Sequence, residues 1–298
     1  MKVLVLGASG FLGNIVQEVL SLKFEVYGTT TSSFLRDPSQ VNFNYSGKES
    51  IQKLLMQINP DCVINCVALA DVDKAEANPS LAKFLNFELP RNLSELCQGG
   101  GIKLIHISTD HFESPIDGLD EAEDPRPINV YSQTKLDGDL AILENSNSAT
   151  IIRTNFFGRS HSGDKGLVDF VIKSFQDSQE ISGFQNVFFN PVGAHFLATC
   201  IQKLVVSDYC GILNISSTRL LSKYEFLCLV AEKLNLDSTR VIPQDYARIA
   251  GSASRPKCMS LNPSMLRAFL GVELPSIETQ LDMELSGIIS LLADKDDK

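Results

Sequence analysis

A glycine-rich turn near the amino terminus constrains this chain more than any other feature of its sequence. Residues 2–6 form a short, nearly continuous apolar run, which is typical of a parallel strand buried on both faces. Gly7, Gly10 and Gly13 follow, and a helical pattern comes next. Such a turn presents backbone N–H groups and the positive end of a helix to a pyrophosphate. A plain strand-to-helix turn is the alternative, but the position directly after the first strand favours dinucleotide binding.

The alternation of strands and helices continues through the first half of the chain. Apolar runs predict further strands at residues 24–28, 61–68, 102–107 and 149–153. Periodically spaced apolar residues predict helices between them, at 51–58 and 79–97. The connections are short and no repeat is visible. This pattern predicts an α/β fold with a doubly wound parallel sheet of the Rossmann type.

The end of the second predicted strand bears on the choice of cofactor. An NAD site usually places an Asp or Glu there to hold the ribose hydroxyls. Here the strand runs into the hydroxyl-rich residues 29–33, with Arg36 shortly after and no acid before Asp37. Hydroxyls and an arginine suit a 2′-phosphate, so we expect NADP(H) in preference to NAD(H), with Thr30 and Arg36 among its contacts. The alternative for Arg36 is a solvated loop charge.

The pattern becomes less regular beyond residue 158. We expect residues 1–158 to form an NADP(H)-binding Rossmann domain and residues 159–298 to form mainly a smaller C-terminal α/β substrate lobe. A late strand near 211–215 is expected to rejoin the sheet. Ser222 followed by Glu225 is typical of a capping box at a helix start.

Composition and charge narrow the class of protein. The 298 residues are 44% apolar and 21% charged, as in ordinary globular proteins, and the net charge of −10 argues against nucleic acid or a membrane surface as a partner. No apolar run approaches the roughly 18 residues that span a bilayer. Seven cysteines without a Cys-x-x-Cys pair, and four histidines without ligand spacing, predict neither a disulfide framework nor a metal site. A reducing cytoplasm fits best.

Two polar motifs are candidates for the chemistry. Tyr131 and Lys135 stand four residues apart, so on a helix they share one face. A nearby ammonium is expected to lower the pKa of the phenol and make it a better proton donor and acceptor. Ser108, Thr109 and Asp110 follow a predicted strand, at the edge where open α/β sheets bind ligands. Tyr-x-x-x-Lys alone is a weak signal, because a packed tyrosine and a solvated lysine would look the same.

The order and spacing of these motifs resemble the extended short-chain dehydrogenase/reductase superfamily. The resemblance rests on the three glycines, on the segment Asn65-Cys66-Val67-Ala68, on Ser108-Thr109-Asp110 and on Tyr131-x-x-x-Lys135. Within the superfamily the chain is most similar to the dTDP-4-dehydrorhamnose reductase branch, over residues 2–271. Such a protein is implied to reduce the 4-keto group of a nucleotide-linked 4-keto-6-deoxy sugar with NADP(H), in deoxysugar and polysaccharide biosynthesis.

The resemblance also implies roles for individual residues. Tyr131 would protonate the keto oxygen, Lys135 would lower the tyrosine pKa and hold the nicotinamide ribose, and Thr109 would hydrogen-bond the same oxygen. The residues implied to contact the cofactor are Gly7, Ser9, Gly10, Phe11, Leu12, Gly13, Thr30, Arg36, Cys66, Val67, Ala68, Tyr131 and Lys135. The residues implied to contact the sugar nucleotide are Val72, Thr109, Asp110, Asn155, Phe156 and Arg255. For Arg255 a structural ion pair is the alternative.

The chain departs from the family pattern on the sugar side. His111-Phe112-Glu113 stands where the branch usually has Tyr-Val-Phe, and Phe156 stands for a tryptophan. Ala68-Leu69-Ala70 stands for Ala-Tyr/His-Thr and lacks an expected hydroxyl, and His195 stands where an aspartate is common. Two alternatives therefore stay open beside the reductase. One is a nucleotide-sugar epimerase on the same scaffold. The other is a non-catalytic NADP-binding subunit similar to the regulatory β subunit of methionine adenosyltransferase. A homodimer is possible in each case.

Overall fold

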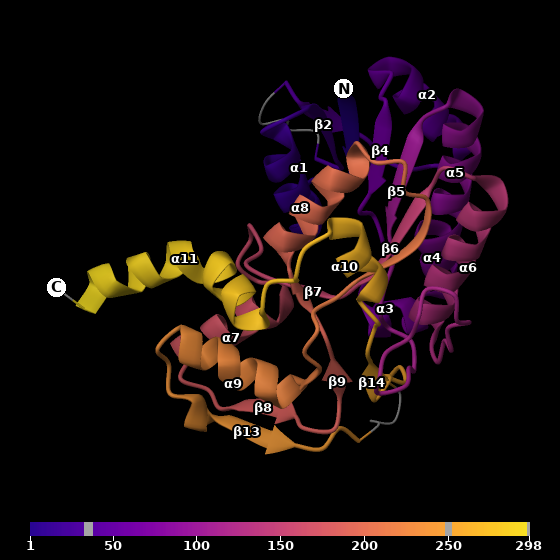
Figure 1. The fold of residues 1–298 in the computed structure, drawn as a ribbon. Coiled ribbons are helices and arrows are strands. Elements are labelled where there is room, and N and C mark those ends of the chain that lie inside the picture. Colours follow the sequence, from indigo (N-terminus) through magenta and orange to yellow (C-terminus); the bar gives the residue numbers. More distant parts are fainter. Residues whose placement is uncertain (33–37, 248–251, 297–298) are drawn as a thin grey trace.

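The protein is described by a computed structural model that covers residues 1–32, 38–247 and 252–296, with side chains to residue 286. Its centre is a seven-stranded sheet in which every neighbouring pair of strands is parallel (Figure 1). The strand order is β11-β6-β5-β4-β1-β2-β3. The strands are β1 (Lys2–Leu6), β2 (Glu25–Thr30), β3 (Gln40–Asn42), β4 (Cys62–Asn65), β5 (Lys103–Ile107), β6 (Thr150–Thr154) and β11 (Gly211–Ile215).

Helices cover both faces of this sheet, as the continuous apolar strands predicted. Successive side chains of a strand point to opposite faces. Val3 and Val5 accordingly pack in one buried cluster with α1 (Phe11–Ser21) and α8 (Ala194–Val205). Leu4 and Leu6 pack in a second cluster with helices of the other face, which are α2 (Lys48–Ile58), α5 (Leu89–Gly100) and α6 (Val130–Asn145). The doubly wound Rossmann fold is therefore confirmed.

The helix predicted over residues 79–97 has an internal irregularity. It consists of α4 (Pro79–Lys83), a π-helical turn η1 (Phe84–Glu88) and α5. Gly101, with a φ of 65°, ends it in the left-handed conformation that glycine adopts without steric cost. Such π-turns often mark functional sites, and this one carries a buried asparagine, Asn86.

A second group of elements lies against the carboxyl edge of the sheet (Figure 1). Its buried core contains side chains of α7 (Gly166–Gln176), α9 (Lys223–Lys233) and α11 (Ile277–Asp296). The predicted capping box of Ser222 and Glu225 starts α9. The small strands are paired as β8 (Ile181–Phe184) with β13 (Val241–Gln244), and β9 (Phe188–Phe189) with β12 (Leu221–Ser222) and β14 (Cys258–Met259).

The chain crosses between the two groups several times. Short strands β7 (Phe156–Phe157) and β10 (Val192–Gly193) pair with each other, and α8, β11 and α10 (Ser264–Leu270) lie on the large sheet. The strand expected near 211–215 is β11, which pairs with β6. Two short helical segments, α3 (Val72–Ala77) and η2 (Ser238–Arg240), complete the fold. None of the helices within the described ranges is long and apolar enough to cross a membrane.

Candidate active site

The glycine-rich turn packs its backbone too closely for side chains. Gly7 has a φ of 81°, and its N–H donates to Thr29 Oγ1 at 2.9 Å. A Cβ at Gly13 would lie 2.2 Å from the Gly7 carbonyl oxygen, so only glycine lets α1 start this near the loop. Gly10 is the N-cap of α1 and contributes no side-chain cap, and the first turn holds no acid. Phe11 and Leu12 begin the helix. This arrangement fits a bound pyrophosphate.

A cavity of about 260 Å³ adjoins this turn. It is lined by Ala8, Ser9, Asn14, Thr30, Ser32, Gln40 and His161. Ser9 and Thr30, both predicted from the sequence to contact the cofactor, lie together here, while Arg36 falls outside the described residues. His161 comes from the segment after β7, and no sequence pattern pointed to it. A hydroxyl-rich hollow beside a helix start fits the adenosine half of a dinucleotide.

The segment after β4 closes the opposite side of the glycine turn. A Cβ at Gly7 would lie 3.0 Å from Val67 Cγ2, so the two backbones are in close contact. The Asn65 Oδ1 accepts a hydrogen bond from the Val67 N–H at 3.1 Å, which fixes the segment that continues through Ala68. Cys66 is partly buried, and desolvation raises the pKa of its thiol to about 12, so the thiol is protonated and unreactive at neutral pH.

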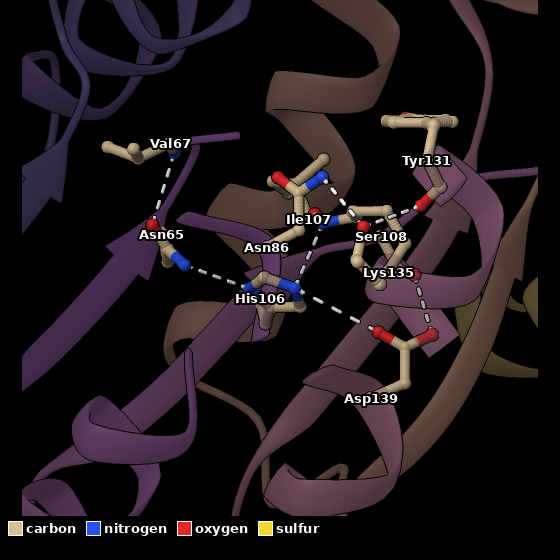
Figure 2. A network of polar contacts seen from close by, with 10 residues as sticks. Asn65, Val67, Asn86, His106, Ile107, Ser108, Tyr131, Lys135 and Asp139 are labelled. Atoms are coloured by element: carbon tan, nitrogen blue, oxygen red, sulfur yellow. Dashed lines mark hydrogen bonds and ion pairs between the residues drawn. The ribbon is translucent and has the colours of Figure 1, made fainter. Parts of the chain in front are cut away.

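Tyr131 and Lys135 lie one turn apart on α6, and Tyr131 hydrogen-bonds with Thr109. The Asn129 side chain accepts from the Ser132 N–H at 2.8 Å in a capping box, which starts α6 and sets Tyr131 in its first turn. Tyr131 is buried, with 9% of its surface exposed. The Lys135 ammonium donates to the Ile107 carbonyl at 2.7 Å and lies 3.1 Å from His106 Nε2 (Figure 2).

The tyrosine pKa differs from the sequence prediction. Burial raises the pKa of Tyr131 to about 12, against a smaller opposing effect of its hydrogen bond with Thr109. Asp110 and Asp139 raise it further. The predicted lowering by Lys135 is therefore wrong for this geometry, because burial dominates and the ammonium is engaged by the Ile107 carbonyl. Burial likewise lowers the pKa of Lys135 to about 8, and Asp139 opposes this shift.

A buried polar network surrounds the Lys135 side chain (Figure 2). Asn65 Nδ2 lies 3.0 Å from His106 Nδ1, and His106 in turn contacts Lys135. The Ser108 hydroxyl donates to Asp139 Oδ2 at 2.6 Å, one helical turn beyond Lys135. Burial first, and then the Lys135 charge, lower the pKa of His106 well below its usual range, so its imidazole is neutral. The network fixes the direction of the Lys135 side chain.

Asn86 extends this support to the segment after Ala68. Its Oδ1 accepts from the Leu69 N–H at 2.8 Å, and its Nδ2 donates to Thr134 Oγ1 at 3.2 Å. Val72, one of the predicted substrate residues, packs with Leu69 around Tyr131. The π-helical turn thus joins the Tyr131 helix to the Leu69 segment.

A larger cavity of about 460 Å³ lies next to Tyr131, between the two groups of elements. Its lining residues are His111, Asn155, Leu167, Phe170, Ser182, Phe184, Val187, Lys223, Leu227, Tyr246, Arg255, Pro256 and Met259. The His111 ring contacts the Tyr131 ring edge-on, with centroids 5.5 Å apart, so the cavity reaches the tyrosine through His111. The predicted substrate residues Asn155 and Arg255 are therefore part of its wall.

The other four predicted substrate residues are absent from that wall. Val72 and Thr109 lie beside Tyr131. Phe156 instead packs edge-on against Phe11, with ring centroids 5.3 Å apart, on the glycine-turn side. Asp110 is 3% exposed and lies behind Asn155, whose Nδ2 donates to Asp110 Oδ2 at 2.9 Å. Lys223 and His111 belong to the wall although neither was predicted as a contact, because only the folded chain brings residues 111 and 223 together.

Arg255 reaches the cavity as part of an ion pair. Its Nη2 lies 2.5 Å from Asp73 Oδ2. Burial lowers the pKa of the guanidinium, but the Asp73 hydrogen bond and charge outweigh it and the pKa is raised overall. The Asp73 Oδ1 also accepts from the Ala253 N–H at 3.0 Å. Arg255 therefore forms a structural ion pair with Asp73 and also lines the cavity.

Comparison with known proteins identifies the family. A model of the RmlD substrate binding domain matches residues 1–287. The chain belongs to this family. It is thus a member of the extended short-chain dehydrogenase/reductase superfamily, in the branch similar to dTDP-4-dehydrorhamnose reductase, as the motifs predicted.

Individual relatives of this RmlD-family chain carry different names. It is 28% identical over 292 residues to the "Probable low-salt glycan biosynthesis reductase Agl14" of Haloferax volcanii, covering 94% of this chain and 96% of that protein. It is 29% identical to the "Methionine adenosyltransferase 2 subunit beta" of Xenopus laevis, covering 89% and 81%. The dTDP-4-dehydrorhamnose reductase of Bacillus anthracis, solved in complex with NADP, superposes with a TM-score of 0.85 at 27% identity, covering 96% and 98%.

Proposed function

We propose that this chain is an NADP(H)-dependent oxidoreductase that reduces the 4-keto group of a nucleotide-linked 4-keto-6-deoxy sugar. One observation carries the proposal: Tyr131, one helical turn from Lys135 and hydrogen-bonded with Thr109, touches His111 in the wall of a cavity of about 460 Å³. The NADP complex of the Bacillus anthracis reductase supports the cofactor class. Such a reaction belongs to deoxysugar and polysaccharide biosynthesis in the cytoplasm.

Tyr131 is assigned the role of proton donor. A phenol with a pKa of about 12 is fully protonated at neutral pH, which is the state that a donor needs before the reaction. Its proton would pass to the keto oxygen as negative charge develops there. Thr109 is assigned the second hydrogen bond to that oxygen, and the Lys135 ammonium is assigned the stabilisation of the tyrosinate left behind.

The cofactor would lie along the carboxyl edge of the sheet. The turn of Gly7, Gly10 and Gly13 would hold the pyrophosphate, with Ser9, Phe11 and Leu12 at the helix start. Thr30 and Ser9 would contact the adenosine ribose, with NADP(H) preferred to NAD(H). Cys66, Val67 and Ala68 would border the nicotinamide half, and Lys135 its ribose. When bound, reduced nicotinamide supplies the hydride.

The proposal is tested by NADPH consumption with a panel of nucleotide-linked sugars. We expect turnover with 4-keto-6-deoxy sugars, one sugar product per NADPH, and weaker binding of NADH in a fluorescence titration. Cofactor that stays tightly bound through purification, with sugar isomerised and no net NADPH consumed, would instead identify an epimerase.

A second candidate function is a non-catalytic, NADP-binding subunit of another enzyme. The similarity to the methionine adenosyltransferase 2 β subunits supports it. The departures from the family pattern also support it, because Phe156 packs against Phe11 on the glycine-turn side. Tight NADPH binding with no turnover on any sugar, and stoichiometric binding to a methionine adenosyltransferase catalytic subunit, would favour this candidate over the reductase.

A further inference from the structure

Lys223 is a cation in the cavity wall that none of the roles above uses. It is the first residue of α9, and it lines the cavity of about 460 Å³. Its ammonium lies 3.2 Å from the centroid of the Phe189 ring. Within the described ranges its ammonium donates no hydrogen bond to a protein group. Because removing an ammonium from water is costly unless hydrogen bonds replace the water, this cation is set up for a polar ligand group.

Asp110 supplies the balancing charge from behind the wall. Burial lowers the pKa of Lys223 to about 8, and the Asp110 charge opposes this shift. Burial raises the pKa of Asp110 to about 6, and the Lys223 charge opposes that shift. No direct ion pair between these two residues is found in the described part of the chain, so the interaction acts through space and leaves the Lys223 donors available.

Asp110 also orients the neighbouring amide. Because Asn155 Nδ2 donates to Asp110 Oδ2 at 2.9 Å, the Asn155 Oδ1 is left as the acceptor at the cavity. The wall therefore offers a cationic donor and a neutral acceptor, both tied to Asp110. A hydroxyl can accept from an ammonium and donate to an amide oxygen at the same time, whereas a carbonyl cannot donate and a bare carbon does neither.

Lys223 and Asn155 line the cavity that the proposed keto sugar would occupy. Asp110 directly follows Thr109, and His111 lines the same cavity while its ring touches Tyr131. The cavity also has apolar lining residues, which are Leu167 and Phe170 of α7 and Leu227 of α9. The donor and acceptor thus share the cavity wall with His111, and Asp110, which interacts with both, is the chain neighbour of Thr109.

We propose that Lys223 and Asn155 recognise a free hydroxyl on the sugar carbon next to the keto group, with Asp110 as the positioning residue. This inference rests on the proposed reductase function and narrows its substrate to ketosugars that keep this hydroxyl. Lys223 acts as a specificity residue and takes no part in the proton transfer.

The test compares kcat/KM for a nucleotide-linked 3-hydroxy-4-keto-6-deoxy sugar and its 3-deoxy analogue. We expect the wild type to prefer the hydroxylated sugar by about 10- to 100-fold, as for a hydrogen bond to a charged group. Lys223→Met should lose most of this preference through KM, Lys223→Arg should retain part of it, and NADPH binding should be unchanged in both. Lys233→Met is the matched control, because Lys233 lies on the same helix but pairs with Asp282 at the surface.

Three results would overturn the inference. Equal kcat/KM of the wild type for both sugars would overturn the inference. This result needs no variant, so it remains decisive even if Lys223→Met fails to fold. Full preference retained in a folded Lys223→Met protein would do the same. An equal loss of affinity for the nucleoside diphosphate alone would assign Lys223 to the phosphates instead. If the wild type reduces no nucleotide-linked ketosugar, the proposed function itself fails and the inference falls with it.

Discussion

At the scale of single residues, the main feature is a tyrosine whose burial disfavours its ionised form. As the proposed proton donor, Tyr131 needs its proton before the reaction and must lose it during the reaction. Burial secures the first condition by raising its pKa to about 12. The second condition requires a cation or hydrogen-bond donors near the phenolate, and Lys135 and Thr109 are the neighbouring groups that could provide them.

The raised pKa of Tyr131 is directly measurable. We predict that the ultraviolet difference spectrum between wild type and Tyr131→Phe, recorded without cofactor, shows no phenolate signal up to about pH 10 and gains it only toward pH 12. Because the folded protein holds this proton more tightly than the unfolded chain, the contribution of Tyr131 to stability is full below pH 10 and is lost as the pH rises through about 12. A tyrosine that titrates below pH 10 and disappears in Tyr131→Phe would show that Lys135 controls the phenol instead.

The sequence was sufficient to place residues whose position depends on a local pattern. Gly7, Gly10 and Gly13 follow a strand, Ser108 to Asp110 end one, and Ser222 with Glu225 caps a helix, because turns, strand ends and caps are short-range features. The through-space interaction of Lys223 with Asp110 and the packing of Phe156 on Phe11 depend on how distant segments meet. No spacing rule reports such contacts, and the pKa of Tyr131 depends on burial that only the complete fold defines.

At the scale of elements, the start of α1 depends on backbone contact with the glycine loop. We predict that Gly13→Ala lowers the free energy of unfolding by about 1–3 kcal/mol and weakens NADPH binding, because the new methyl group would meet the Gly7 carbonyl oxygen at 2.2 Å. Thermal unfolding and a fluorescence titration measure the two effects.

The matched control for this substitution is Gly99→Ala in α5. A Cβ at Gly99 would meet nothing within 4 Å, so the exchange should leave NADPH binding unchanged and should raise stability by up to about 1 kcal/mol. If both variants bind NADPH like the wild type, the close packing of the glycine turn is unrelated to the cofactor.

A second element contact joins α11 to α8. The His195 N–H donates to Glu284 Oε1 at 2.7 Å, and the ring Nδ1 lies 2.9 Å from Glu284 Oε2. The hydrogen bond to Glu284 is the main cause that raises the pKa of His195, against an opposing effect of burial. The histidine that replaces the family's usual aspartate thus pairs with the buried Glu284 carboxylate.

The raised pKa makes this contact depend on pH. Its contribution to stability is full below the unfolded value of about 6.5 and is lost as the pH rises through the folded pKa. We predict that His195→Gln, which keeps the backbone bond, destabilises the protein by about 0.5–1 kcal/mol at pH 6 and by less at pH 8.5, because the side chain is half exposed. Urea unfolding at the two pH values measures this, and an equal loss at both would contradict an ionic origin.

At the scale of the whole molecule, the candidate site is shared between the two groups of elements. The sheet contributes the glycine turn, Thr109 and Asn155 from its carboxyl edge, and the second group contributes Lys223, Arg255 and most of the apolar wall. Because the chain crosses between the groups through β7, α8 and β11, their contact is part of the fold. The cavity wall thus includes residues of both groups, whereas the polar network around Lys135 belongs to the sheet and α6.

The most direct test of the central proposal measures single-turnover NADPH oxidation by wild type and Tyr131→Phe, with NADPH affinity determined for both. We predict that the wild type reduces a nucleotide-linked 4-keto-6-deoxy sugar and that Tyr131→Phe binds NADPH equally well but reacts at least about 100-fold more slowly. Equal rates in the two proteins would contradict the assignment of Tyr131 as the proton donor.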